Sequence, residues 1–137
     1  MTSSRILFLC TGNYYRSRFT ELLFNWHATK EGIVWRAESR GLALELGNNN
    51  RGPISPHVIA GLRTRGITFD GAVSFPQQAQ ASDLMRADRI IALDETEHLP
   101  LLAQRFPAWL ARVEFWQVPD LPRASVASAL TAMETQV

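Results

Sequence analysis

Hydrophobic residues fall into short continuous runs that alternate with stretches of helical spacing. Residues 6–9 form an unbroken apolar run, typical of a strand buried on both faces of a parallel sheet. Phe19, Leu22, Leu23 and Trp26 then share one face of a predicted helix that ends near residue 32. Residues 33–39 predict a second strand.

The middle of the chain contains a polar loop and a second helix. Gly47, Gly52 and the three asparagines between them indicate a loop over residues 41–53. Ser55 followed by Pro56 favours a helix start, with the serine as the cap and the proline in the first turn. This helix is predicted to end at residue 66.

The last part of the chain repeats the alternation of helix and strand. Residues 67–75 predict at most a short strand and residues 82–86 a short helix. A buried strand is expected at residues 89–93, and a capping box at 94–97 opens a helix to about residue 106. A final strand at 113–116 and a weak helix at 124–133 complete the pattern.

Strands that alternate with helices predict an α/β fold. We expect one domain over residues 1–137, with three layers: a four-stranded parallel sheet and helices on both faces. Ligands of such sheets bind beyond the carboxyl ends of the strands. The turn after the first strand is therefore the first candidate site, and it contains Cys10, the only cysteine.

Composition narrows the function classes. A formal net charge of +1 gives no general attraction to nucleic acid or to an anionic membrane, so neither is an expected partner. One cysteine excludes an internal disulfide and a clustered-thiolate zinc site. No segment is predicted as a signal sequence or membrane span, and a cytoplasmic protein is expected. We expect no metal or other cofactor, because the three histidines are far apart in sequence and are expected at surface or half-buried positions.

The segment from Cys10 to Ser17 has the composition of a phosphate-binding loop followed by a helix. Such a loop points successive backbone N–H groups inward, and the next helix adds its positive end. Gly12 and Asn13 are the residue types that best tolerate the backbone angles this requires. The same N–H groups would stabilise Cys10 as a thiolate nucleophile.

Two side chains complete this predicted site. Arg16 is placed to present its planar fork to two phosphate oxygens. Ser17 is placed to donate its hydroxyl to the sulfur of Cys10. A cysteine and an arginine with five residues between them are a weak signal alone. A lone cysteine at the end of a strand is more often a small buried hydrophobe, but the order strand, Gly-Asn turn, Arg-Ser and helix favours the site.

The run Cys10-Thr11-Gly12-Asn13, two residues and then Arg16-Ser17 after an amino-terminal strand resembles the low-molecular-weight protein tyrosine phosphatase family. The resemblance continues through four later segments, at residues 38–39, 52–67, 82–94 and 118–120. Ser39 is similar to a serine that supports the loop in that family. The loop residues that the resemblance assigns to phosphate binding and loop support are Thr11, Gly12, Asn13, Tyr14, Tyr15 and Ser17.

The resemblance implies a two-step phosphomonoester hydrolysis through a phosphocysteine, without metal. Cys10 would attack phosphorus, Arg16 would hold the phosphate, and Asp120 would be the general acid. The implied partners are a phosphorylated protein or a small aryl phosphate as substrate, and inorganic phosphate or another oxyanion in the loop.

The chain departs from the family pattern in several places. Arg18 replaces a proline, and it is expected either to extend the positive rim or to lie in solvent. Leu121 follows Asp120 where relatives have a proline and then an aromatic, so Asp94 and Asp88 are weighed as alternative acids, with helix capping and a strand-end turn as their ordinary roles. The loop over residues 44–52 lacks the aromatic that sets substrate preference in relatives. Tyr14 and Tyr15 are expected to divide between a pocket wall and the core.

Two other functions remain open at this point. A phosphate- or phosphopeptide-binding regulator with little turnover would keep the loop and tolerate the altered acid segment. Arsenate reduction is ranked last, because the thioredoxin-linked reaction needs further cysteines and this chain would have to use an external thiol.

Overall fold

The computed structural model describes residues 4–47, 50, 52–67 and 74–117. All strand pairs of its four-stranded sheet are parallel, and the strands lie in the order β2-β1-β3-β4. The strands are β1 (Arg5–Cys10), β2 (Arg36–Gly41), β3 (Arg89–Ala92) and β4 (Val113–Phe115). The helices are α1 (Arg16–Glu31), α2 (Pro56–Thr64), α3 (Ala81–Arg86) and α4 (Glu95–Arg105), with 3₁₀ turns η1 (Leu44–Gly47) and η2 (Pro107–Arg112).

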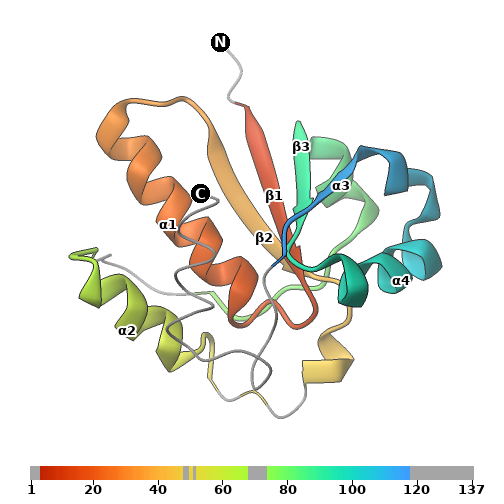
Figure 1. Cartoon of the computed structure of the whole chain (residues 1–137), viewed down its shortest axis with the longest axis horizontal. Helices are drawn as coiled ribbons and strands as arrows, with labels where there is room; N and C mark the ends of the chain where they lie inside the picture. The colour runs from red at the N-terminus through yellow and green to blue at the C-terminus, as the bar shows by residue number, and fades with distance from the viewer. Residues whose placement is uncertain (1–3, 48–49, 51, 68–73, 118–137) are drawn as a thin grey trace.

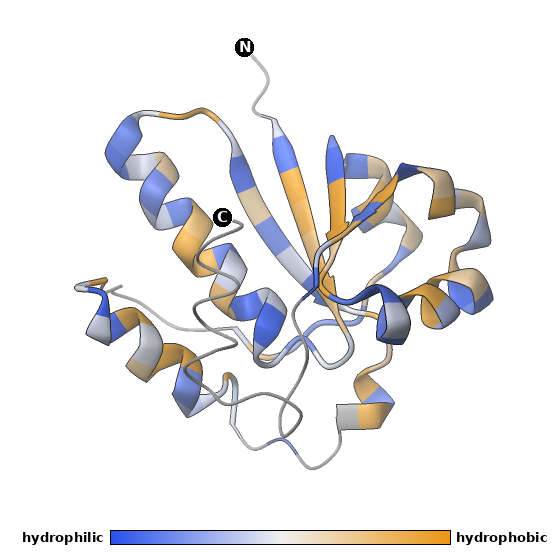
Figure 2. Cartoon of the chain, viewed as in Figure 1, coloured by the Kyte–Doolittle hydropathy of each residue, from blue (hydrophilic) through white to orange (hydrophobic). Residues whose placement is uncertain are grey.

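The sheet separates two hydrophobic cores, which gives the predicted three layers (Figure 1). Ile6 and Phe8 of β1 pack on the side of α1 and α2. Leu7 and Leu9 alternate with them and pack on the side of α3 and α4. Figure 2 shows this run of hydrophobic residues of β1 in the middle of the molecule. The predicted fold class is confirmed, because the continuous apolar run is buried on both faces.

The helix boundaries follow the predicted capping residues. Gly32 ends α1 in a left-handed conformation with φ of 69°, which glycine adopts without steric cost. The Ser55 hydroxyl accepts the N–H of His57 at 3.2 Å and begins α2. Asp94 caps α4 by accepting the N–H of Glu97 at 3.0 Å. Each helix in the described part of the chain is too short or too polar to span a membrane.

The predicted start of the second strand was wrong. β2 begins at Arg36 rather than residue 33, and Ile33 and Val34 are 40% and 52% exposed in the connection that precedes it. Hydrophobicity alone suggested a strand there, but the chain must still cross from the end of α1 to the sheet. The predicted loop over residues 41–53 also contains the η1 turn. The predicted weak helix at 124–133 lies outside the described residues.

The carboxyl ends of β1 and β2 are joined just where the chain leaves the sheet. The N–H of Leu42 donates to the carbonyl of Cys10 at 2.8 Å, and that of Ala43 to the carbonyl of Thr11 at 3.0 Å. Gly41 is the residue opposite Cys10 in the β1–β2 register. A Cβ at Gly41 would lie 2.8 Å from the Thr11 carbonyl oxygen and 3.0 Å from the Asn13 nitrogen. The segment after Cys10 therefore packs directly on a glycine.

We expect Gly41→Ala to destabilise the protein and to distort the segment after Cys10. The added methyl would contact backbone atoms that cannot rotate away, so we expect a loss of about 1–3 kcal/mol in the free energy of unfolding, measured by urea titration. Gly32→Ala is the matched control, because no atom lies within 4 Å of its Cβ position. It should cost only the left-handed backbone strain, about 1 kcal/mol, and leave the Cys10 region unchanged. Equal losses in the two variants would contradict the close-packing argument.

Candidate active site

A pocket of about 140 Å³ opens at the carboxyl end of β1. We call residues 10–17 the Cys10 loop. The pocket is lined by Cys10, Thr11, Gly12, Tyr14, Tyr15, Arg16, Leu46 and Asn50. The fold thus gathers six residues of the Cys10 loop around one small cavity, whereas Asn13 and Ser17 are not part of its lining. Leu46 and Asn50 join them from the η1 region, where the sequence showed only a polar loop without an aromatic.

The sulfur of Cys10 lies at the end of β1 and contacts a hydroxyl. Cys10 is 3% exposed, and its Sγ lies 2.9 Å from Oγ of Ser17 in the first turn of α1. The predicted pair of thiol and serine is therefore in contact. Which of the two atoms donates the hydrogen is decided by their neighbours.

The side-chain amide of Asn13 limits the choice by occupying one acceptor site on Ser17. Its Oδ1 accepts the backbone N–H of Gln77 at 2.9 Å, and a backbone N–H can only donate. The amide nitrogen must therefore face the other way, where it donates to Oγ of Ser17 and to Oγ of Ser39, both at 2.9 Å. Oγ of Ser17 thus already accepts one hydrogen bond, which leaves its own hydrogen available to donate to Cys10 when the sulfur is a thiolate.

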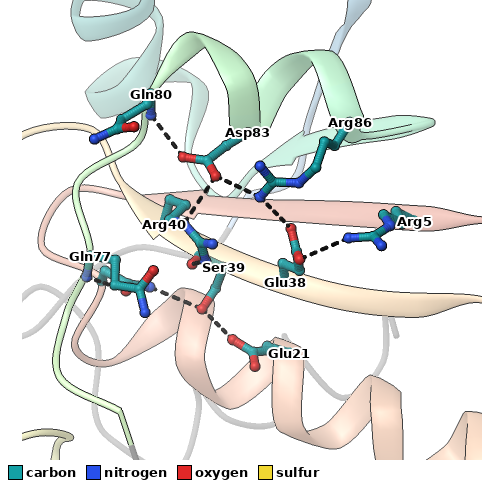
Figure 3. A network of polar contacts seen from close by, with 10 residues as sticks. Arg5, Glu21, Glu38, Ser39, Arg40, Gln77, Gln80, Asp83 and Arg86 are labelled. Carbon is teal, nitrogen blue, oxygen red and sulfur yellow. Dashed lines mark hydrogen bonds and ion pairs between the residues drawn. The ribbon is translucent and has the colours of Figure 1, made fainter.

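Ser39 extends this chain of hydrogen bonds to a buried carboxyl group. Its hydroxyl donates to Oε1 of Glu21 (Figure 3). Burial raises the pKa of Glu21, although the Ser39 hydrogen bond and the charges of Arg18 and Arg40 oppose the shift. Ser39 thus lies where a loop-supporting residue was expected, and it connects the Cys10 loop to α1.

The backbone of the Cys10 loop is left-handed at Asn13 and not at Gly12. Asn13 has φ of 50°, a conformation that asparagine tolerates better than most residues. Its side-chain hydrogen bonds hold that geometry in place. The prediction that this pair supplies the unusual angles holds for Asn13.

Arg16 lies beneath the loop with its side chain 2% exposed. Its Nη2 donates to Oε2 of Glu97. The same carboxylate oxygen accepts the Thr11 hydroxyl at 2.8 Å and a hydrogen from Nε2 of His98 at 2.9 Å. Partial burial opposes ionisation of Glu97, but the hydrogen bond from His98 and the charge and hydrogen bond of Arg16 hold its pKa well below its usual range.

Sequence reasoning missed the site contacts of Glu97 and His98. Glu97 was expected only as part of a capping box, and the N–H of Glu97 does bond to Asp94, while its carboxylate contacts the loop. His98 was expected at the surface or half-buried, and this was wrong, because it is fully buried. No sequence signal identified either contact, because α4 and the Cys10 loop are far apart in the chain and come together only when the sheet folds.

Burial lowers the pKa of His98, and the nearby charge of Arg16 adds to this effect, while the Glu97 hydrogen bond opposes it. His98 is therefore neutral, with its hydrogen on Nε2 facing Glu97. Among the described residues its Nδ1 has no hydrogen-bond partner. The side chain acts as a neutral donor that orients Glu97.

The two tyrosines were expected to divide between the pocket wall and the core, but both line the pocket. Tyr15 is 6% exposed and belongs to the core between the sheet and α1, whereas Tyr14 is partly buried, and both line the pocket. Arg18 was expected at the rim or in solvent, and this was wrong, because it is 4% exposed.

The candidate acids have different outcomes. Asp120 lies outside the described residues, so its position stays a prediction. Asp94 caps α4, and Oδ2 of Asp88 accepts the backbone N–H of Arg5 at 2.8 Å. Both therefore have the structural roles that the sequence suggested for them. No group of three His, Cys, Asp or Glu side chains within the described ranges is arranged to hold a metal ion.

The family model described as low molecular weight phosphotyrosine protein phosphatase matches residues 5–120. The chain belongs to this family. The match covers the whole described sheet and includes the Cys10 loop, so the resemblance seen in the motif extends along most of the chain.

Relatives include phosphatases of more than one substrate class. The chain is 36% identical over 92 residues to the low molecular weight protein-tyrosine-phosphatase YfkJ of Bacillus subtilis. The aligned region covers 65% of this chain and 55% of YfkJ. It thus spans little more than half the length of that relative. It is 29% identical over 108 residues to the protein-arginine-phosphatase of the same organism, which covers 79% of this chain and 67% of the relative.

The crystal structure of YfkJ from Bacillus subtilis has the same fold. It superposes with a TM-score of 0.80 and 25% identity, over 98% of this chain and 90% of that one. The overall fold of this chain is therefore that of a family member.

We expect His98→Gln to remove part of the acid sensitivity of folding. The pKa of His98 is lower in the folded state than in the unfolded state, where it is about 6.5. The contribution of His98 to the free energy of unfolding is therefore complete above pH 6.5 and is lost as the pH falls below that value. The loss amounts to about 1.4 kcal/mol per pH unit while folded His98 stays neutral.

Urea unfolding of the wild type and of His98→Gln between pH 7.5 and 5 measures this difference. Glutamine keeps a hydrogen-bond donor for Glu97, so the variant isolates the titration. Parallel curves of stability against pH for the two proteins would contradict this prediction, because they would show that His98 takes up its proton equally in the folded and unfolded states.

Proposed function

We propose that this chain is a cysteine-dependent phosphomonoester hydrolase, of the protein tyrosine phosphatase type, that works through a phosphocysteine without metal. The observation that carries the proposal is the contact between Cys10 and Ser17. A Ser17 hydroxyl that donates to the sulfur stabilises a thiolate, and a thiolate at the base of a small pocket is a nucleophile.

In the proposed first step, the Cys10 thiolate attacks phosphorus and an S–P bond forms. The bond from phosphorus to the ester oxygen breaks, and Asp120 donates a proton to that oxygen as it leaves. Arg16 and the backbone N–H groups of Thr11, Gly12, Asn13, Tyr14 and Tyr15 stabilise the charge on the phosphoryl oxygens.

In the proposed second step, water attacks the phosphorus of the phosphocysteine. Asp120, now ionised, accepts a proton from the water, and the S–P bond breaks. The sulfur leaves as a thiolate, which the Ser17 hydroxyl stabilises, and inorganic phosphate is released. Ser39 supports this geometry through Asn13.

The pocket walls favour a flat apolar group on the phosphate. Tyr14, Tyr15 and Leu46 line the cavity beside the sulfur, and aromatic and aliphatic side chains bind an aryl ring by apolar contact. We infer that the substrate is phosphotyrosine in a protein or another aryl phosphate. The similarity to an arginine phosphatase makes phosphoarginine the comparison substrate.

The reaction requires a reduced Cys10, and no other cysteine is available to protect it. A thiol of this kind persists in a reducing compartment, so we propose that the protein acts in the cytoplasm. A phosphate-binding regulator remains the alternative function, because the segment around Asp120 departs from the family pattern.

We expect Cys10→Ser to lose turnover and to keep phosphate binding. A serine hydroxyl is far less ionised than a thiol, so hydrolysis of para-nitrophenyl phosphate should fall by at least about 10³-fold. Vanadate should inhibit the wild type, and added metal should not be needed.

Full turnover in Cys10→Ser would contradict the phosphocysteine route. Phosphate binding by the wild type without turnover would favour the regulator. Arsenate reduction that depends on an added thiol, without phosphatase activity, would favour the reductase.

For Asp120→Ala we expect a rate loss that grows as the leaving group becomes more basic. A general acid contributes about 10²–10⁴-fold where the leaving oxygen needs a proton, and less where it does not. A series of substituted phenyl phosphates measures this slope. Asp94→Asn is the matched control: Asp94 caps α4, and asparagine caps a helix about as well, so this variant should keep the wild-type dependence on the leaving group. A steeper leaving-group dependence in Asp94→Asn alone would move the acid role to Asp94.

A further inference from the structure

The side chain of Arg18 is a buried cation beside the Cys10 loop. It lies in the first turn of α1, two residues after Arg16, and is only 4% exposed. Transfer of a charged group from water to the interior is costly unless polar groups surround it. The fold therefore places polar partners around this guanidinium.

Those partners are carbonyl oxygens from three separate segments. Nη1 of Arg18 donates to the carbonyl of Pro53 at 3.1 Å and lies 3.4 Å from the carbonyl of Asn13. Nη2 donates to the carbonyl of Ser74 at 2.7 Å. One planar group thus connects the Cys10 loop, the approach to α2 and the segment before α3.

The same segments are joined to the loop by backbone contacts. The N–H of Ser55 donates to the carbonyl of Tyr14 at 3.1 Å, and the N–H of Gln77 donates to the Asn13 amide at 2.9 Å. Arg18 therefore adds a third point of attachment on the side of α1. Its guanidinium fixes where Asn13 lies relative to both neighbouring segments.

These three acceptors are carbonyl oxygens, which carry no formal charge, so they do not neutralise the positive charge of Arg18. Burial lowers the pKa of Arg18, and Glu21 and Cys10 oppose that shift when they are ionised. An arginine stays protonated under such conditions. The charge of Arg18 therefore acts on these two groups through the protein interior. Coulomb interactions are stronger there than in water.

We propose that Arg18 is a positioning residue of this site: its guanidinium holds the Cys10 loop against its neighbouring segments and supplies a fixed positive charge that stabilises the Cys10 thiolate. The inference deepens the proposed function, on which its catalytic consequence rests. The two effects are separable, because the charge acts on the sulfur and the planar fork acts on the loop.

The test uses two variants of Arg18 and one control. Arg18→Met keeps an apolar stem without charge, and Arg18→Lys keeps the charge without the planar fork. Arg65→Met is the matched control: Arg65 is half-buried, packs on Phe19 and donates to the carbonyl of Gly61 in α2, the helix that it follows. Circular dichroism and urea unfolding establish that each variant is folded.

The first measurement is the rate at which iodoacetamide alkylates Cys10 at about pH 6, which reports the thiolate without any turnover. We expect Arg18→Met to react at least about fivefold more slowly than the wild type. Arg18→Lys and Arg65→Met should react at nearly the wild-type rate. An unchanged rate in folded Arg18→Met would overturn the electrostatic part.

The second measurement is the inhibition constant of inorganic phosphate, with KM and kcat for para-nitrophenyl phosphate. We expect Arg18→Lys to raise the inhibition constant and KM by about tenfold while kcat changes less, because one ammonium cannot bond three carbonyls at these positions. Wild-type values in Arg18→Lys would overturn the positioning part, and this variant decides the matter if Arg18→Met does not fold.

Failure of the proposed function gives a different result. A wild type that is alkylated rapidly and binds phosphate but does not hydrolyse para-nitrophenyl phosphate would refute the phosphatase, while the alkylation comparison among the Arg18 variants would still test this inference.

Discussion

The side-chain amide of Asn13 makes three hydrogen bonds, one to a backbone N–H and two to serine hydroxyls. The backbone partner fixes which end of the amide faces the serines, so both serine oxygens accept its hydrogens. The Ser39 hydrogen is then donated to Glu21, and the Ser17 hydrogen is available to a Cys10 thiolate. The chemistry of the site therefore depends on an interaction that crosses from the loop to the segment containing Gln77.

That segment is itself held against the edge strand β2. The N–H of Gly41 donates to the carbonyl of Gln77 and the N–H of Ala79 to the carbonyl of Gly41, both at 2.8 Å. Asp83 then anchors the start of α3 by ion pairs with Arg40 at 3.3 Å and Arg86 at 2.8 Å (Figure 3). The sheet edge thus supports the amide that supports the loop, and the exposed edge of β2 is partly covered.

Charge around the Cys10 loop is distributed on two sides. Arg16 lies against Glu97, whose carboxylate also accepts bonds from Thr11 and the neutral His98. Arg18 lies on the other side, bonded to carbonyl oxygens. The first arginine is held by an anion and the second by neutral dipoles, so the two cations affect the loop differently.

The sequence by itself determined the α/β fold and the place of the loop after β1, and it predicted the roles of Cys10, Arg16 and Ser17 that experiments can now test. It did so because these features are local: apolar runs, caps and a short motif depend on neighbours in the chain. Tertiary structure alone decided that Glu97 and His98 reach the loop, that Leu46 lines the pocket and that Arg18 is buried. Those contacts join segments far apart in sequence, and burial depends on what packs over a residue rather than on its own polarity.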